Sequence, residues 1–214
     1  MKAVFVLGLA ALLAAPLLAQ HQSDPDKKVA GGGTLPTGWK ARLDDSAPIA
    51  GVKVMPMGGG LHFMTGPAGI YYRPSDKASG AYEARATFTQ MAPAAHPEAY
   101  GIIIGGSGLE GAAQKYTYFL IRQDGKYLIK RRAGAETPTI ADWTDSPSVR
   151  KADTSGKMSN TLAVDVGRDK VRFLVNGEEV TSTDTAKVDT DGVAGLRINH
   201  NLNVHVEGFA VKTR

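Results

Sequence analysis

The sequence of 214 residues contains no cysteine. This absence excludes disulfides, thiolate metal centres and cysteine nucleophiles, so the fold has to be stabilised by the burial of apolar side chains. The sequence also lacks a strong charge of either sign, because its formal net charge is only +4. We therefore predict that nucleic acid is not a partner. No segment after residue 19 has the pattern of an amphipathic helix, which argues against helical and α/β folds.

The N-terminus has the pattern of a secretory signal. Lys2 precedes an apolar run over residues 3–19, which ends in the small residue Ala19. A short basic start, an apolar core and a small residue at the end predict a signal peptide over residues 1–19 that is cleaved before Gln20. We expect the mature chain to have no membrane span and to be exported, to a bacterial periplasm or to the medium.

Two regions follow the signal peptide. Residues 20–38 are rich in Asp, Lys, Gly, Pro and Thr and include three consecutive glycines at 31–33. This composition predicts a flexible leader. Residues 39–214 are of a size that one domain with its own core accounts for.

Residues 160–211 have the clearest pattern in the chain. Short runs with alternating apolar residues are separated by turn residues, which predicts a β-meander. Asn176 and Gly177 tolerate the positive φ angles of a two-residue type I′ turn, so Val180 is predicted to lie opposite Phe173.

Earlier segments predict further strands. Residues 80–91 alternate and predict a central strand, and residues 100–104 are continuously apolar, as in a strand buried on both sides. Residues 116–122 and 126–132 predict a hairpin, as do residues 51–57 with 61–65. Residues 133–159 are polar and rich in turn residues, so we predict a long irregular loop there, with Trp143 as its largest apolar residue. In all, the pattern predicts an all-β protein, with two antiparallel sheets packed as a β-sandwich or jelly roll.

The order of these segments resembles the concanavalin A-like lectin/glucanase superfamily over most of the mature chain. The resemblance rests on residues 80–88, 100–104, 116–122, 173–177 and 192–196. Within the superfamily, the chain is most similar to laminin-G-like modules and to bacterial domains of the 3-keto-disaccharide hydrolase kind. The resemblance implies a sandwich that binds or hydrolyses carbohydrate.

Hydrolysis would require two carboxylates on either side of the scissile bond. The glucanase branch places them on one strand as Glu-x-Asp-x-x-Glu, and this sequence has no such motif. We therefore assign no catalytic residue. If the protein is a glycoside or 3-keto-disaccharide hydrolase instead, Glu83, Glu98 or Asp142 are the acid/base candidates.

No cofactor is predicted. The histidines match no zinc motif and are scattered along the sequence. Calcium remains an alternative, because Asp189 and Asp191 precede a strand in the order Asp-x-Asp-Gly, and these two residues would be its first ligands to test. The same spacing is also ordinary turn chemistry, in which each carboxylate accepts from nearby backbone amides.

Aromatic and polar side chains in the chain suit carbohydrate recognition, since aromatic rings stack on the C–H surfaces of sugars. The tyrosines among them are equally good core residues, and three polar residues in a row around His200 are equally good loop residues. We predict an exported, non-catalytic module that binds a glycan, with a scaffold without a small ligand as a further alternative; the oligomeric state is open. The predicted ligand-binding residues are Tyr72, Arg73, Tyr116, Tyr118, Arg122, Trp143, Asn199 and His200.

Overall fold

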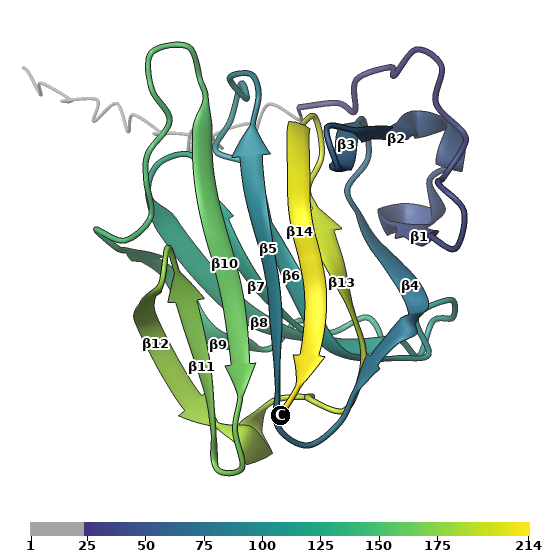
Figure 1. The fold of residues 1–214 in the computed structure, drawn as a ribbon. Helices are drawn as coiled ribbons and strands as arrows, with labels where there is room; N and C mark the ends of the chain where they lie inside the picture. The colour runs from purple at the N-terminus through teal and green to yellow at the C-terminus, as the bar shows by residue number, and fades with distance from the viewer. Residues whose placement is uncertain (1–23) are drawn as a thin grey trace, which may run out of the picture.

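The computed structural model describes residues 24–214. They form two antiparallel sheets of seven strands each, packed face to face (Figure 1). This arrangement confirms the predicted all-β sandwich. The predicted signal peptide, residues 1–19, lies outside the described residues. None of the helices within residues 24–214 is both long enough and apolar enough to cross a membrane.

The first sheet has the order β1-β4-β13-β6-β7-β8-β9, and in Figure 1 its strands β6 to β9 lie behind the second sheet. Its strands are β1 (Lys40–Leu43), β4 (Gly69–Ala78), β13 (Gly192–Ile198), β6 (Ala99–Ser107), β7 (Lys115–Arg122), β8 (Lys126–Ala133) and β9 (Thr139–Asp145).

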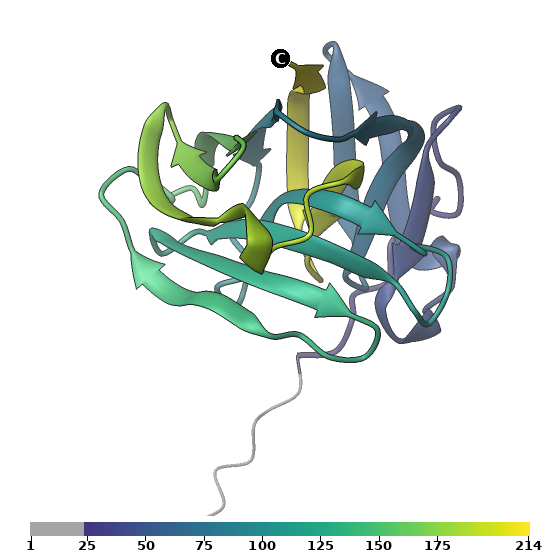
Figure 2. The same cartoon turned by 90° about the horizontal axis from the view of Figure 1, so that it is seen from below.

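The second sheet has the order β12-β11-β10-β5-β14-β3-β2. Seen from below, the two sheets lie one above the other as layers (Figure 2). The strands of the second sheet are β12 (Glu178–Asp184), β11 (Lys170–Val175), β10 (Met158–Val166), β5 (Tyr82–Gln90), β14 (Asn203–Thr213), β3 (Gly60–Thr65) and β2 (Val52–Met57). Three short 3₁₀ helices connect strands: η1 (Asp44–Ser46), η2 (Ile49–Gly51) and η3 (Thr185–Lys187).

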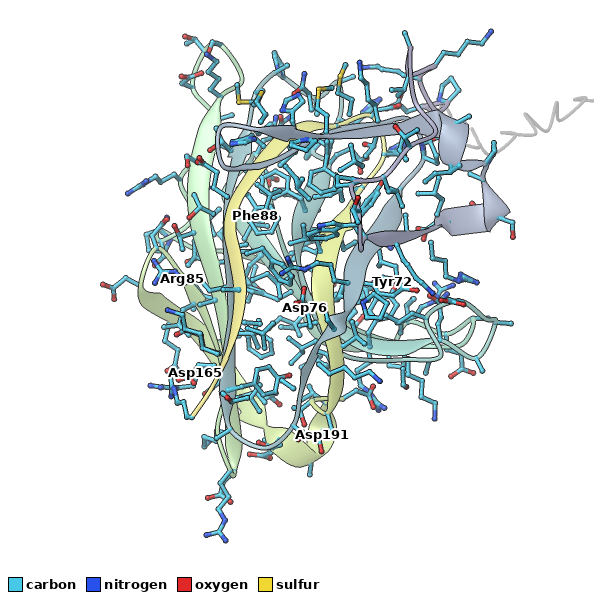
Figure 3. The ribbon with its side chains drawn as sticks, turned by 45° about the vertical axis from the view of Figure 1, so that its right-hand side comes forward. Tyr72, Asp76, Arg85, Phe88, Asp165 and Asp191 are labelled. Atoms are coloured by element: carbon cyan, nitrogen blue, oxygen red, sulfur yellow. The ribbon has the colours of Figure 1, made fainter. Side chains whose placement is uncertain are left out.

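The core between the sheets follows from the alternation of the strands. In β5, Tyr82, Ala84, Ala86 and Phe88 are fully buried, while the residues between them point outward. Figure 3 shows Phe88 inside the sandwich and Arg85 on the outside of the second sheet. The predicted central strand is thus confirmed, because a period of two places every second side chain on the same face.

The predicted hairpins are also present. Asn176 has φ of 54° and Gly177 has φ of 89°, as a type I′ turn requires. The register beyond this turn differs from the prediction, because Phe173 lies opposite Thr181 and not opposite Val180. A β-bulge between Phe173 and Leu174 shifts the pairing by one residue.

Two segments predicted to be irregular contain ordered structure or contacts. Residues 133–159, predicted as a long loop, contain the edge strand β9. In the leader, residues 24–38 form no strand, yet the backbone N–H of Gly33 donates to the carbonyl of Val52 at 3.0 Å. The flexibility of the leader stays a prediction.

Candidate functional site

Both faces of the first sheet carry buried side chains. Its inner face belongs to the core, and its outer face carries a second cluster of apolar and aromatic side chains. In Figure 3, Tyr72 lies beside β4 on the side away from the second sheet. We call this surface the outer face; its buried members are Ile70, Tyr72, Ala99, Ile103, Leu109, Tyr116, Tyr118, Leu120, Leu128 and Val193.

An arginine lies within this apolar surface. Arg197 of β13 has a side chain that is only 14% exposed, and its two terminal nitrogens donate to the carboxylate of Asp44 at 2.7 and 3.3 Å. Burial alone would lower the pKa of Arg197, but the hydrogen bonds and the charge of Asp44 outweigh it and raise the pKa. For Asp44 the same pairing outweighs burial and lowers the pKa. Both groups are therefore charged at neutral pH.

Two tyrosines lie next to Arg197. The guanidinium carbon of Arg197 is 5.7 Å from the centre of the Tyr118 ring, and the rings of Tyr116 and Tyr118 are 5.7 Å apart. Burial raises the pKa of both tyrosines, so their hydroxyl groups are protonated at neutral pH. They can donate and accept hydrogen bonds, as a sugar hydroxyl requires of its partner.

Two more arginines border the tyrosines. With its amide oriented to satisfy its neighbours, the side-chain oxygen of Gln114 accepts from Arg42 at 3.1 Å and from Arg132 at 3.3 Å. The basic groups of Arg42 and Arg132 also help to lower the pKa of Asp44. This part of the outer face thus combines three guanidinium groups with one carboxylate.

A tryptophan stands at the far edge of the outer face. Trp143 of β9 packs partly buried against the apolar cluster, and the guanidinium carbon of Arg122 lies 4.3 Å from the centre of its ring. Arg122 also donates to Asp124 at 2.8 Å. The indole is therefore held by a cation–π contact, with part of its surface left open to solvent.

An open depression of about 650 Å³ lies at the other edge. Its lining includes Tyr72, Leu109 and the ion-paired side chains Lys40 and Glu110. Leu109 and Glu110 belong to the connection between β6 and β7, which brings them over the sheet. The depression gives this edge of the outer face room for a ligand.

The predicted site residues fall into three groups. Five of the eight share the outer face: Tyr72, Tyr116, Tyr118, Arg122 and Trp143. Arg73 points to the other side of β4, where it binds Asp76 at 2.7 Å and lies 5.3 Å from the ring of Trp39. There it lines a separate pocket of about 260 Å³ with Trp39 and Phe209.

Asn199 and His200 form the third group and face the N-terminal segment. His200 Nε2 lies 2.8 Å from Glu98 Oε1, and its Nδ1 lies 3.3 Å from Asp26 Oδ1. Asn199 donates to the second oxygen of Glu98 at 3.2 Å. These polar groups connect Asp26 and Glu98, which directly precedes β6, to the turn after β13, and none of these contacts involves the tyrosines.

The candidate acid/base residues do not converge. Glu83 lies on β5 of the second sheet and pairs with Arg214 at 3.8 Å, whereas Glu98 contacts His200 and Asp142 lies on β9 of the first sheet. Asp142 Oδ1 accepts from the backbone N–H of Trp143 at 2.8 Å. The arrangement of these three carboxylates is thus unlike the facing pair of a glycosidase.

The candidate calcium ligands have protein partners. Asp189 accepts two hydrogen bonds from Arg131, at 3.0 and 3.1 Å, and Asp191 accepts from the backbone N–H of Gly80 at 3.2 Å. Within residues 24–214, no three His, Cys, Asp or Glu side chains are grouped so that they alone could hold a metal ion.

Arg197 and Asp44 were missed by reasoning from the sequence. One signal was present, because Arg197 stands between Leu196 and Ile198 in an otherwise apolar strand. A charged residue in such a strand has to find a partner when it is buried. Its partner lies more than 150 positions earlier, and no local pattern connects the two.

Comparison with known proteins gives the fold. No protein-family profile and no curated protein match the sequence. Among solved structures, the chain is similar to carbohydrate-binding module CBM66 from Bacillus subtilis, with a TM-score of 0.60 and 10% identity over 83% of this chain and 96% of that one. It is also similar to a protein of unknown function with a galectin-like fold from Bacillus subtilis (TM-score 0.54, 12% identity, 82% and 89% coverage). A family 7 alginate lyase is similar as well (TM-score 0.53, 11% identity, 83% and 95% coverage). At identities of 10–12%, these likenesses show the fold alone, a two-sheet antiparallel β-sandwich of the concanavalin A-like kind, as expected from the sequence.

Proposed function

We propose that the protein is an exported, non-catalytic module that binds carbohydrate on the outer face of its first sheet. The observation that carries this proposal is the combination of Tyr116, Tyr118 and Trp143 with the buried ion pair of Arg197 and Asp44. Sugar sites join aromatic surfaces to a few fixed polar groups, and the outer face supplies both. The carbohydrate-binding module among the similar structures supports the same class of ligand.

The charge of the outer face favours a sugar that bears a carboxylate. Arg42, Arg132 and Arg197 lie close together, and Asp44 is the carboxylate that they share. Guanidinium groups bind carboxylates in a planar, bidentate manner that neutral sugars cannot reproduce. We therefore expect oligosaccharides of uronic acids to bind more tightly than neutral ones, and we expect the difference to shrink as salt is added.

The carboxylates of this face favour binding over hydrolysis. Asp44, Glu110 and Asp124 each pair with a basic side chain. A general acid in a glycosidase needs a raised pKa, whereas the pKa of Asp44 is lowered. Hydrolytic activity would therefore require carboxylates outside this set.

The two tryptophans of the chain allow a direct test. Trp143 lies on the outer face and Trp39 lies in the pocket near Arg73, so each replacement by Phe leaves one fluorescent reporter. After glycan-array screening with neutral and acidic oligosaccharides, the best ligand is titrated into both variants. We expect the emission of Trp143 to respond in the Trp39→Phe variant, and that of Trp39 to stay constant in the Trp143→Phe variant.

Affinity measurements complete the test. Trp143→Ala should weaken binding by about tenfold or more, which corresponds to about 1.4 kcal/mol, whereas Trp39→Phe should leave the affinity unchanged. Binding that is insensitive to Trp143→Ala contradicts the choice of surface. Absence of binding across the array, together with release of sugar from a glycoside or keto-sugar, contradicts the proposal itself.

Export has its own test. Expression of the full sequence in a bacterium, followed by cell fractionation and N-terminal sequencing, should give a mature chain that starts at Gln20. A cytoplasmic chain that retains its first nineteen residues would contradict export.

A further inference from the structure

The opposite side of the sandwich brings two histidines together. His62 of β3 and His205 of β14 lie directly opposite each other in the antiparallel pairing, with ring centres 6.2 Å apart and ring planes at 33°. Their neighbours Phe63, Val204 and Val206 belong to the core between the sheets, so the two histidines point to the outside of the second sheet.

Both imidazoles are buried and incompletely bonded. His62 is 9% exposed and His205 is 8% exposed. The Nδ1 atom of each ring is buried without a hydrogen-bond partner among the described residues, and so is Oδ1 of Asn203, which precedes His205 by two positions on the same face. Buried polar atoms without a partner are costly, so three of them on one face indicate that a partner is missing.

Methionines neighbour the pair in the strand register. Met55 of β2 lies directly opposite His62 in the register of β2 and β3, and Met64 follows His62 by two positions on the same face. Met57 lies farther along the outer side of β2 and is 40% exposed. A thioether sulfur is a soft and polarisable group, and together with imidazole it is the ligand set that suits copper, above all Cu(I).

We propose that His62, His205 and Met55 form a binding site for one soft monovalent metal ion, Cu(I). An ion about 2.0 Å from one nitrogen of each imidazole, at a wide angle, places the ring centres about 6 Å apart. The observed separation of 6.2 Å agrees with this spacing. Met55 in the neighbouring strand would supply the third ligand, and Met64 a fourth.

A nearby carboxylate also suits a metal. Glu207 Oε1 lies 3.5 Å from His205 Nε2, where a carboxylate can orient the ring.

The turn from β2 to β3 leaves room at the site. A side chain built on Gly60 would come within 3.1 Å of the His205 ring and within 2.2 Å of the Val206 carbonyl oxygen. Glycine at position 60 thus allows β14 to approach the turn closely, and a larger residue would also crowd the imidazole. The proposed site lies on the second sheet, so it is independent of the proposed sugar site on the first.

The test is anaerobic competition for Cu(I) between the purified protein and the chromogenic chelator bicinchoninate. We expect one Cu(I) per chain, about tenfold weaker binding in Met55→Leu, and at least hundredfold weaker binding in His62→Ala and His205→Ala. Met55→Leu keeps the side-chain volume nearly unchanged, so it tests the sulfur even if a histidine variant fails to fold. X-ray absorption of the copper-loaded protein should show both nitrogen and sulfur scatterers.

The matched controls are His96→Gln and Met158→Leu. His96 lies in the exposed connection before β6, and Met158 is buried in the core, so neither change should affect the affinity for Cu(I). Failure to compete with the chelator, equal affinity in Met55→Leu and the unmodified chain, or tighter binding of Zn(II) than of Cu(I) would each overturn the proposal.

Discussion

Replacing Asp44 should lower the free energy of unfolding by more than replacing Arg197, its partner in the ion pair. The Arg197 side chain is 14% exposed and the Asp44 side chain is 40% exposed, so the arginine depends more on its partner. Asp44→Ala leaves a charged guanidinium in an apolar surface. Breaking a fully buried pair in this way costs about 3–5 kcal/mol, and because this pair is only partly buried we expect about 2–3 kcal/mol.

The opposite change should cost less. Arg197→Met fills much of the same space with an apolar chain, and the Asp44 carboxylate that it leaves behind can be hydrated. We expect a loss of about 1 kcal/mol in the free energy of unfolding, which is close to the value of an exposed pair. The double variant should resemble Arg197→Met, because Asp44 has no charge to balance once the arginine is gone.

Urea unfolding at pH 7, followed by tryptophan fluorescence, measures these differences as shifts in midpoint at constant m-value. Asp44→Asn, which preserves the shape of the side chain, serves as the control for lost packing and should behave like Asp44→Ala. If Arg197→Met proves the more destabilising single change, the burial of the guanidinium is not what makes the pair important, and the reasoning is refuted.

Three further predictions concern the same surface and the strands beneath it. Because the folded-state pKa of Asp44 is lowered, the stability contributed by its ion pair should be complete above about pH 5 and lost as pH falls below about 4. Urea unfolding from pH 7 to 3 should therefore show a shrinking stability difference between the unmodified chain and Asp44→Ala. A difference that grows as pH falls would contradict this sign. A double-mutant cycle of Arg122→Ala and Trp143→Ala should give a coupling of about 0.5–1 kcal/mol, and additive effects would show that the observed 4.3 Å contact contributes nothing. Asn176→Gly should lower the unfolding free energy by about 1–3 kcal/mol, because the side-chain hydrogen bonds of Asn176 are lost. Asn176→Ala should lower it by about 1 kcal/mol more, because alanine disfavours a φ of 54°. Equal thermal stability of the two variants would count against the backbone contribution.

The sequence predicts most of the strands, because each is defined by the alternation of nearby residues. The Asn176-Gly177 turn is predicted for the same reason, since two residues alone determine it. The pairing of Val180 was wrong because a bulge leaves no trace in a pattern of alternating residues. Trp143 was predicted to lie in a loop because the polar edge strand β9 has no apolar face of its own.

The candidate sites are less predictable because they depend on contacts between distant segments. Five outer-face residues could be named from residue type alone, yet Arg73, adjacent to Tyr72, points to the opposite side of the same strand. The two histidines of the second sheet looked scattered along the chain, and only the pairing of β3 with β14 places His62 against His205. Pairings of this kind are set by the whole sheet and not by local sequence.

The positions of β13 and β14 have a consequence for how the chain reaches its folded state. In the first sheet β13 joins β1-β4 to β6-β7-β8-β9, and in the second sheet β14 joins β12-β11-β10-β5 to β3-β2. Residues 192–213 therefore connect the two halves of each sheet. Without them, each sheet would be two unconnected halves with exposed edges (Figure 1). The pairings within each half can form without residues 192–213, but the two halves of a sheet cannot join. Deleting residues 203–213 should thus harm the protein far more than deleting an equal length within residues 24–38, which form no strand, and folding should be slow and all-or-none.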